Sequence, residues 1–154
     1  MTTTTEQNIT ITRYHEGYDP DIIRLCAAFS DESLKEYGLE VTNDRLGQMI
    51  LLCKDISFFL LVDGQVVGLI AGMMVNNLTN GKKALQEIIW FVDKKFRSRG
   101  TLLLSYFEEA ARNLGASQIV MALMCNSKAE ALGRFYESIG YKPFEVQYMK
   151  EIPR

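Results

Sequence analysis

Hydrophobic and polar positions change their period several times along the chain, and each change predicts a new element. Asn8–Arg13 alternates as Ile-Thr-Ile-Thr, which is typical of a strand. A helical region follows, because Asp19 suits a cap, Pro20 suits the first turn, and apolar residues then recur at helical spacing. A second short helix is expected over Ser30–Gly38, and a third is expected after Thr42.

Three apolar runs in the middle of the chain predict an antiparallel meander. The runs are Ile56–Val62, Val66–Val75 and Ala84–Val92. Asp63-Gly64 separates the first two, and Asp-Gly is a favoured tight hairpin turn. A polar loop containing Asn80-Gly81 separates the last two.

Helical spacing returns over Arg97–Leu114, where one apolar face is expected to hold Leu103, Phe107, Ala110 and Leu114. Gly115 would end this helix, and Gln118–Met124 reads as a short buried strand. A last helix is expected over Ser127–Ile139, with a capping box formed by Ser127 and Glu130.

Tyr141–Ile152 completes the pattern as a final strand region. The order is therefore β-αα-βββ-α-β-α-β, an α/β chain. The strand–helix–strand unit from Ala84 to Met124 implies two parallel strands, so the sheet should be mixed. We expect one domain over residues 7–154, preceded by a flexible segment over 1–6.

Composition excludes several classes of function. The 154 residues carry 17 basic and 19 acidic side chains, a net charge of −2 that argues against broad nucleic-acid binding. Three cysteines and one histidine without ligand spacing argue against a metal site. No apolar run approaches the roughly 18 residues of a membrane span, and no secretory signal begins the chain. A cytoplasmic location is expected, with free thiols.

The first chemical signal lies where the third apolar run passes into the helix after it. Lys95, Arg97 and Arg99 gather there, and Gly100 allows a close approach of the backbone. The start of a helix leaves N–H groups unpaired, so it suits a phosphate. A solvated basic loop would carry the same residues. The segment lacks both the ending of a P-loop and the glycine pattern of a dinucleotide site.

Arg97-Ser98-Arg99-Gly100 resembles the R/Q-x-x-G-x-G/A signature of the GNAT family of acetyl-CoA-dependent N-acetyltransferases. The order of elements from about residue 8 to 152 is similar to that acyl-CoA N-acyltransferase fold as well. The resemblance implies that residues 97–102, which include Thr101, hold the pyrophosphate of acetyl-CoA. Leu102 departs from the signature, because the family has a small residue at that place and a leucine would crowd the ligand unless the chain shifts.

The segment from Asn126 to Tyr141 resembles the family's N-x-x-A…F-Y-x-x-x-G-F/Y pattern more specifically. The resemblance implies that Tyr136 protonates the departing thiolate of coenzyme A and that Asn126 contacts its pantetheine arm. A phenol with a pKa of about 10 stays protonated at neutral pH, so it can act in this way. Taken alone, Tyr136 would read as a core aromatic on the apolar stripe of its helix.

Acetyl transfer also requires a neutral amine, and Glu87 is the candidate base. Its carboxylate interrupts an apolar run, which is costly unless it lies on a cleft wall or has a partner. A strand-end glutamate facing solvent, Asp93 as the base, or no dedicated base remain alternatives. The resemblance further implies that backbone groups around Trp90, Phe91 and Val92, often at a bulge, hold the pantetheine and the thioester carbonyl.

Three hypotheses follow. The leading one is direct acetyl transfer from acetyl-CoA to a primary amine of a small molecule, a peptide N-terminus, a lysine or a modified nucleobase. The second is a CoA-binding or interaction module without turnover. The third is unrelated nucleotide binding through the Arg97–Gly100 loop. The resemblance is also compatible with a homodimer.

Overall fold

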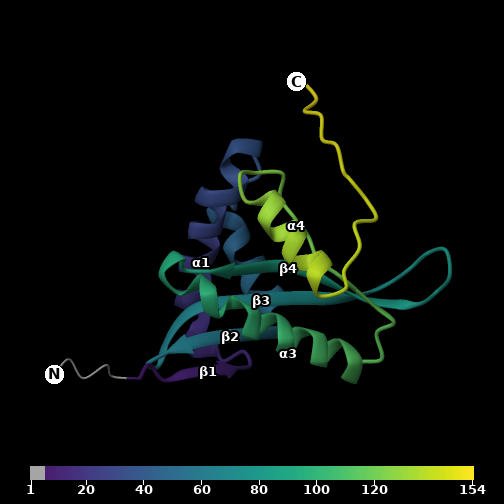
Figure 1. The fold of residues 1–154 in the computed structure, drawn as a ribbon. Helices are drawn as coiled ribbons and strands as arrows, with labels where there is room; N and C mark the ends of the chain where they lie inside the picture. The colour runs from purple at the N-terminus through teal and green to yellow at the C-terminus, as the bar shows by residue number, and fades with distance from the viewer. Residues whose placement is uncertain (1–5) are drawn as a thin grey trace. The chain divides into compact units, whose positions relative to one another are not determined.

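The computed structural model describes residues 6–154. The elements, drawn in Figure 1, are β1 (Ile9–Thr12), η1 (Glu16–Tyr18), α1 (Asp19–Phe29), η2 (Ser30–Leu34), η3 (Lys35–Tyr37), η4 (Asn43–Arg45), α2 (Leu46–Cys53), β2 (Ile56–Val62), β3 (Gln65–Asn76), β4 (Lys83–Val92), η5 (Lys94–Arg99), α3 (Gly100–Asn113), β5 (Gln118–Val120) and α4 (Ala129–Ser138). The chain divides into two compact units, one ending at Ala122 and one spanning Leu123–Arg154. The flexible segment expected over 1–6 lies, apart from Glu6, outside the described residues, and the single domain over 7–154 stays a prediction.

The first unit is built on one mixed sheet in the order β1-β2-β3-β4-β5. The first four strands pair antiparallel, and β5 pairs parallel to β4. The predicted meander is confirmed, and so is the parallel pair across the α3 crossover. Asp63 and Gly64 both have positive φ, 50° and 80°, as the tight hairpin between β2 and β3 requires.

Helices cover both faces of this sheet, because its strands are apolar on both sides. Figure 1 shows α1 behind the sheet and α3 in front of it. On the α1 side the core holds residues of α1, α2 and alternate strand positions, namely Ile22, Leu25, Cys26, Cys53, Phe59, Leu69, Ala71, Ile89 and Phe91. On the α3 side Leu103 and Phe107 are fully buried. Phe107 lies over Gly72, where an added Cβ would come within 2.6 Å of the ring.

The helices differ from their predicted bounds in ways that have local causes. The segment expected as one helix over Ser30–Gly38 is a π-helical turn followed by a 3-10 turn, and Gly38 ends it in the left-handed region. Gly115 ends α3 with a φ of 74°, as expected, and Gly140 follows α4 with a φ of 99°. Leu114, which the helical spacing placed on the apolar face, is 45% exposed because α3 has already ended before it.

Two predictions for the second unit are wrong. The capping box of Ser127 and Glu130 does not form, since α4 begins after Lys128 without a side-chain cap and Glu130 pairs with Arg134 instead. The final strand expected over Tyr141–Ile152 is absent, because those residues form no ladder with any described strand. A strand needs a neighbouring strand that pairs with its backbone groups, and none is described for these residues.

Candidate functional site

The edge of β4 that faces β5 is paired along only part of its length. β5 pairs with Ala84, Leu85 and Gln86 and goes no further. Among the described strands, nothing pairs with that edge from Glu87 to Val92. Every second residue of a strand points its N–H and C=O away from one neighbour, so this stretch presents polar backbone groups to a ligand.

An irregularity in the pairing of β4 with β3 lies beside Glu87. Ala71 pairs with Ile89 and Gly72 pairs with Glu87, so Ile88 is one extra residue in β4. A bulge of this kind bends the strand and turns its backbone groups. The sequence placed the bulge around residues 90–92, whereas those residues pair regularly with β3.

Glu87 lies half-buried at this bulge. One carboxylate oxygen accepts a hydrogen bond of 3.1 Å from the backbone N–H of Ala122, just beyond the end of β5. Removal from water raises the pKa of Glu87 from 4.5 to about 7, and the Ala122 hydrogen bond, which favours the charged form, lowers it in part. The carboxyl group therefore exchanges a proton near neutral pH, as a general base must.

The chain passes from β4 to α3 through a 3-10 turn. The helix expected from Arg97 onward is 3-10 over Lys94–Arg99 and becomes α-helical only at Gly100. No side chain caps the start of α3. Gly100 is buried, and a Cβ there would lie 3.2 Å from Cγ2 of Val92. Gly100 thus brings the start of the helix close to the end of β4.

Most polar side chains of this loop face solvent. Lys95, Ser98, Arg99 and Thr101 are exposed, and Leu102 is 41% exposed in the first turn of α3. The exposed cations lie close to the uncapped helix start, where the backbone itself carries partial positive charge. This combination favours an anion.

Arg97 points inward instead. Its Nε donates a 3.0 Å hydrogen bond to the carbonyl oxygen of Val92, and its Nη2 forms an ion pair with Glu32 of η2. The guanidinium group also lies 5.4 Å from the ring centre of Phe91. Phe91 itself is buried in the α1-side core, so its side chain is not available to a ligand.

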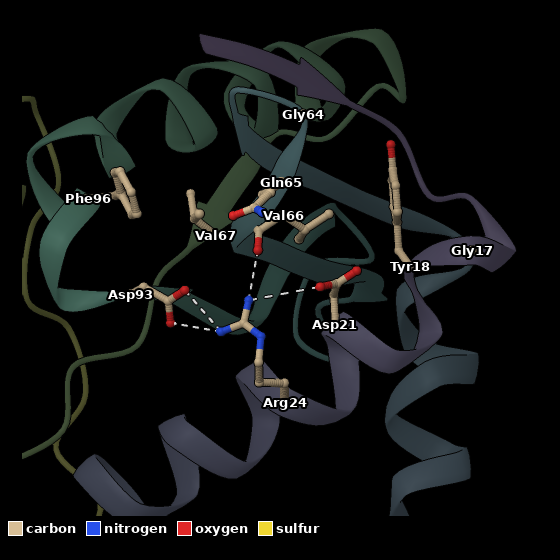
Figure 2. Close-up of a pocket in the computed structure, with 10 residues that line it drawn as sticks. All are labelled: Gly17, Tyr18, Asp21, Arg24, Gly64, Gln65, Val66, Val67, Asp93 and Phe96. Carbon is tan, nitrogen blue, oxygen red and sulfur yellow. Dashed lines mark hydrogen bonds and ion pairs between the residues drawn. The ribbon is translucent and has the colours of Figure 1, made fainter. Parts of the chain in front are cut away.

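A second arginine, which the sequence did not single out, reaches the same loop from α1. Arg24 donates to both carboxylate oxygens of Asp93, at 3.0 and 3.2 Å, and to the carbonyl oxygen of Val66 at 2.7 Å. Figure 2 shows these bonds beside a cavity of about 610 Å³ between α1, the β2–β3 turn and the loop. No motif announces this contact, because Arg24 and Asp93 are 69 positions apart.

Asn126 and Tyr136 belong to the second unit. The side-chain oxygen of Asn126 accepts a hydrogen bond of 3.0 Å from the N–H of Lys128, which fixes the turn before α4. Tyr136 is buried, with its ring 6.1 Å from Phe135 and 5.5 Å from Tyr141. The aromatic packing expected from the helix stripe is therefore present, and the catalytic role of Tyr136 stays a prediction.

The histidine and the two buried cysteines also lie in the first unit. His15 accepts a hydrogen bond from the N–H of Gly17 at the surface. Burial raises the pKa values of Cys26 and Cys53 to about 11 and about 12, so both stay thiols. Within residues 6–154 no three His, Cys, Asp or Glu side chains are arranged to hold a metal ion. None of the helices described is long and apolar enough to cross a bilayer.

Comparison with known proteins decides the family. A model of the acetyltransferase (GNAT) family matches residues 22–141, which include the β4 edge, the loop and the tyrosine helix. This chain belongs to the GNAT family. It is thus an acetyl-CoA-dependent N-acetyltransferase, and acetyl-CoA is the cosubstrate typical of such enzymes.

Solved structures share the fold of this GNAT chain at low identity. A ribosomal-protein-alanine N-acetyltransferase from Brucella melitensis is 18% identical, with a TM-score of 0.70 over 96% of this chain and 100% of that one. The aminoglycoside N-acetyltransferase AAC(6′)-Iy, in complex with CoA, is 14% identical, with a TM-score of 0.70 over 97% of this chain and 98% of that one. A transcriptional regulator from Bacillus halodurans is 17% identical, with a TM-score of 0.73 over 94% and 100% of the two chains. A search of curated protein sequences gives no match.

Proposed function

We propose that this GNAT chain binds acetyl-CoA along the β4–α3 junction and transfers its acetyl group to a primary amine beside Glu87. One observation carries the proposal. A half-buried carboxyl group with a pKa of about 7 lies at the bulge of β4, and the same strand leads through a basic 3-10 turn into the uncapped start of α3. The strand thereby carries the proton acceptor and leads to the anion-binding site at the start of α3.

The diphosphate of the cosubstrate binds at the start of α3. The first backbone N–H groups of the helix donate to its oxygens, and the exposed Arg99 and Lys95 add positive charge. Ser98 and Thr101 offer hydroxyl donors on the same turn. Leu102, which is exposed in the first turn of α3, restricts how deeply the ligand settles.

The thioester arm runs along the open edge of β4. Backbone groups between the Ile88 bulge and Val92 pair with the pantetheine amides as a strand would. An N–H on this edge donates to the thioester carbonyl oxygen, and that bond strengthens as the oxygen becomes negative in the tetrahedral intermediate.

The chemistry is a direct displacement. The ionised carboxylate of Glu87 accepts a proton from the amine, directly or through one water, as the amine nitrogen attacks the thioester carbon. The carbon–sulfur bond then breaks, and the sulfur leaves as a thiolate. Tyr136 gives the thiolate its proton, a role proposed from the family resemblance, and Asn126 binds the pantetheine arm. Free coenzyme A and an amide are the products.

The proposal is tested in two steps. Calorimetric titration of the full chain with coenzyme A measures binding, and an assay of thiol release across a panel of amines measures turnover. The panel should contain polyamines, aminoglycosides, peptides with free N-termini and lysine peptides. We expect binding and turnover with at least one class, and a lower kcat for Tyr136→Phe with an unchanged Kd for coenzyme A.

Two results would contradict it. Binding without turnover on any amine would leave a CoA-binding module. If neither the wild type nor Arg99→Gln bound coenzyme A in the titration, the proposed binding site would be wrong.

A further inference from the structure

The loop that follows β4 is held from the α1 side at its first residue. Asp93 donates its backbone N–H to the carbonyl oxygen of Val67 at 2.8 Å, and its own carbonyl oxygen accepts a 2.8 Å bond from the N–H of Phe96. Its backbone therefore joins the sheet to the first turn of the loop. Arg24 fixes the side chain of this residue through two hydrogen bonds and also binds the carbonyl oxygen of Val66, as Figure 2 shows.

The loop is held from the same side at a second point. Arg97 bonds back to the carbonyl oxygen of Val92, and Glu32 holds the far end of its guanidinium group. Beneath it, the ring of Phe91 packs edge-on against Phe29, the last residue of α1, with ring centres 6.0 Å apart. Only a guanidinium group presents Nε and Nη donors in one rigid plane, so lysine cannot reproduce this pair of bonds.

We propose that Arg24 and Glu32 are positioning residues for coenzyme A, acting through Asp93 and Arg97 on the shape of the 94–100 loop. The inference rests on the proposed function, because it concerns the loop that receives the diphosphate. Neither residue is part of the loop. Arg97 then serves to shape the loop, and the positive charge that meets the diphosphate comes from exposed residues such as Arg99.

The partial exposure of these pairs sets the size of the effect. The side chains of Arg24 and Asp93 are 46% and 29% exposed, and those of Arg97 and Glu32 are 32% and 26% exposed. Water screens such pairs, and Arg24 uses one nitrogen, Nη1, for both oxygens of Asp93 while Nη2 binds the carbonyl oxygen of Val66. We therefore expect Arg24→Gln and Glu32→Gln each to raise the Kd of coenzyme A by about threefold to tenfold.

The experiment compares these two variants with Arg112→Gln in the full chain. Arg112 lies in the last turn of α3, so its replacement removes one positive charge at the end of the helix far from the loop. Calorimetry gives the Kd of coenzyme A, steady-state kinetics gives the KM of acetyl-CoA and kcat, and hydrogen exchange of the free protein reports the order of amides 94–101. We expect a raised KM with unchanged kcat and faster exchange at 94–101 for Arg24→Gln and Glu32→Gln, but not for Arg112→Gln.

Arg97→Lys separates shape from charge. We expect it to weaken binding as much as Arg97→Gln, whereas Arg99→Lys keeps most of the wild-type affinity. An Arg97→Lys protein that binds like wild type would mean that position 97 acts as a charge on the ligand, and this would overturn the inference.

The remaining outcomes distinguish this inference from the proposed function. If the wild type binds coenzyme A and Arg24→Gln and Glu32→Gln behave like Arg112→Gln, the inference is wrong and the proposed function stands. If the wild type does not bind coenzyme A, the proposed function fails, and unchanged exchange at 94–101 would then overturn the inference too.

Discussion

At the scale of single residues, Glu87 is the group whose protonation should control the reaction. Its pKa of about 7 means that the ionised form grows from a minority below neutral pH to a majority above it. We expect kcat/KM to rise with pH through an apparent pKa near 7. Glu87→Gln should lose this rise and fall by about 100-fold, since general base catalysis contributes on that order. A pH–rate profile of both proteins measures this. A mutant that keeps the same profile would assign the proton transfer to another group.

The same residue predicts a pH-dependent stability. The folded pKa of Glu87, about 7, lies above the ordinary value of 4.5, so folding favours the protonated form. Its stabilising contribution is therefore present below about pH 4.5 and is lost as the pH rises through 7. Glu87→Gln should be more stable than wild type at pH 8 by about 1–3 kcal/mol and close to it at pH 4. Urea unfolding at the two pH values tests this, and a constant difference would contradict it.

Leu102 is the residue at which this chain departs from the family signature. It is 41% exposed in the first turn of α3, and helical side chains lean toward the N-terminus, where the diphosphate is proposed to bind. Leu102→Ala should lower the Kd of coenzyme A by about twofold to fivefold, because a shorter side chain leaves the amides more accessible. Leu114→Ala, a similarly exposed leucine beyond the other end of α3, is the matched control and should leave the Kd unchanged. An unchanged Kd for Leu102→Ala would show that the leucine faces solvent.

At the scale of elements, the packing of α3 on the sheet depends on a missing side chain. A Cβ at Gly72 would lie 2.6 Å from Cζ of Phe107 and 2.7 Å from the carbonyl oxygen of Gln86. Gly72→Ala should therefore lower the free energy of unfolding by about 1–3 kcal/mol. Gly47→Ala in α2 is the control, since a Cβ there meets no described atom within 4 Å, and it should stabilise slightly. Phe107→Leu in the Gly72→Ala background should recover part of the lost free energy of unfolding. A Gly72→Ala protein as stable as wild type would contradict the steric argument.

Local signals predicted most elements, because the determining residues are neighbours in sequence. Asp63-Gly64 specifies its hairpin and Gly115 ends α3 through backbone conformations that few other residues adopt. The bulge at Ile88 was not predictable, since it depends on the register between two strands. The inward orientation of the Arg97 side chain was not predictable either, because its partner Glu32 lies 65 positions away in the sequence. The prediction of a final strand over Tyr141–Ile152 was wrong, because a strand depends on pairing with a distant segment and no described strand pairs with these residues.

At the scale of the whole molecule, membership of the GNAT family identifies the reaction and leaves the acceptor open. Two structures with TM-scores of 0.70 to this chain carry names that point to different acceptors, a ribosomal-protein alanine and an aminoglycoside. Substrate choice therefore lies in side chains around the site and not in the order of elements. In this chain, the segment between α1 and α2 carries several acidic residues but no recognisable motif, so its sequence does not identify the acceptor amine. The acidic residues are Asp31, Glu32, Glu36, Glu40 and Asp44.

The net charge of the molecule also bears on how coenzyme A binds. With a net charge of −2, the protein as a whole does not attract an anion, so binding must come from groups within about 10 Å of the diphosphate.

Coenzyme A at 100 times its Kd should stabilise the protein by about 2.7 kcal/mol, a rise in melting temperature of roughly 5–10 °C. 3′-Phospho-ADP, which is the nucleotide part of coenzyme A without the pantetheine arm, should give a smaller rise, because it cannot pair with the open edge of β4. Added salt should reduce both shifts through the exposed cations, yet the difference between the two ligands should persist, since backbone hydrogen bonds are screened much less. Thermal melts at two salt concentrations, with Arg99→Gln as the control that weakens both ligands, measure the two parts of the site separately. Equal shifts for 3′-phospho-ADP and coenzyme A would mean that the loop binds the nucleotide without any help from β4, and the acetyl group would then have no defined place to react.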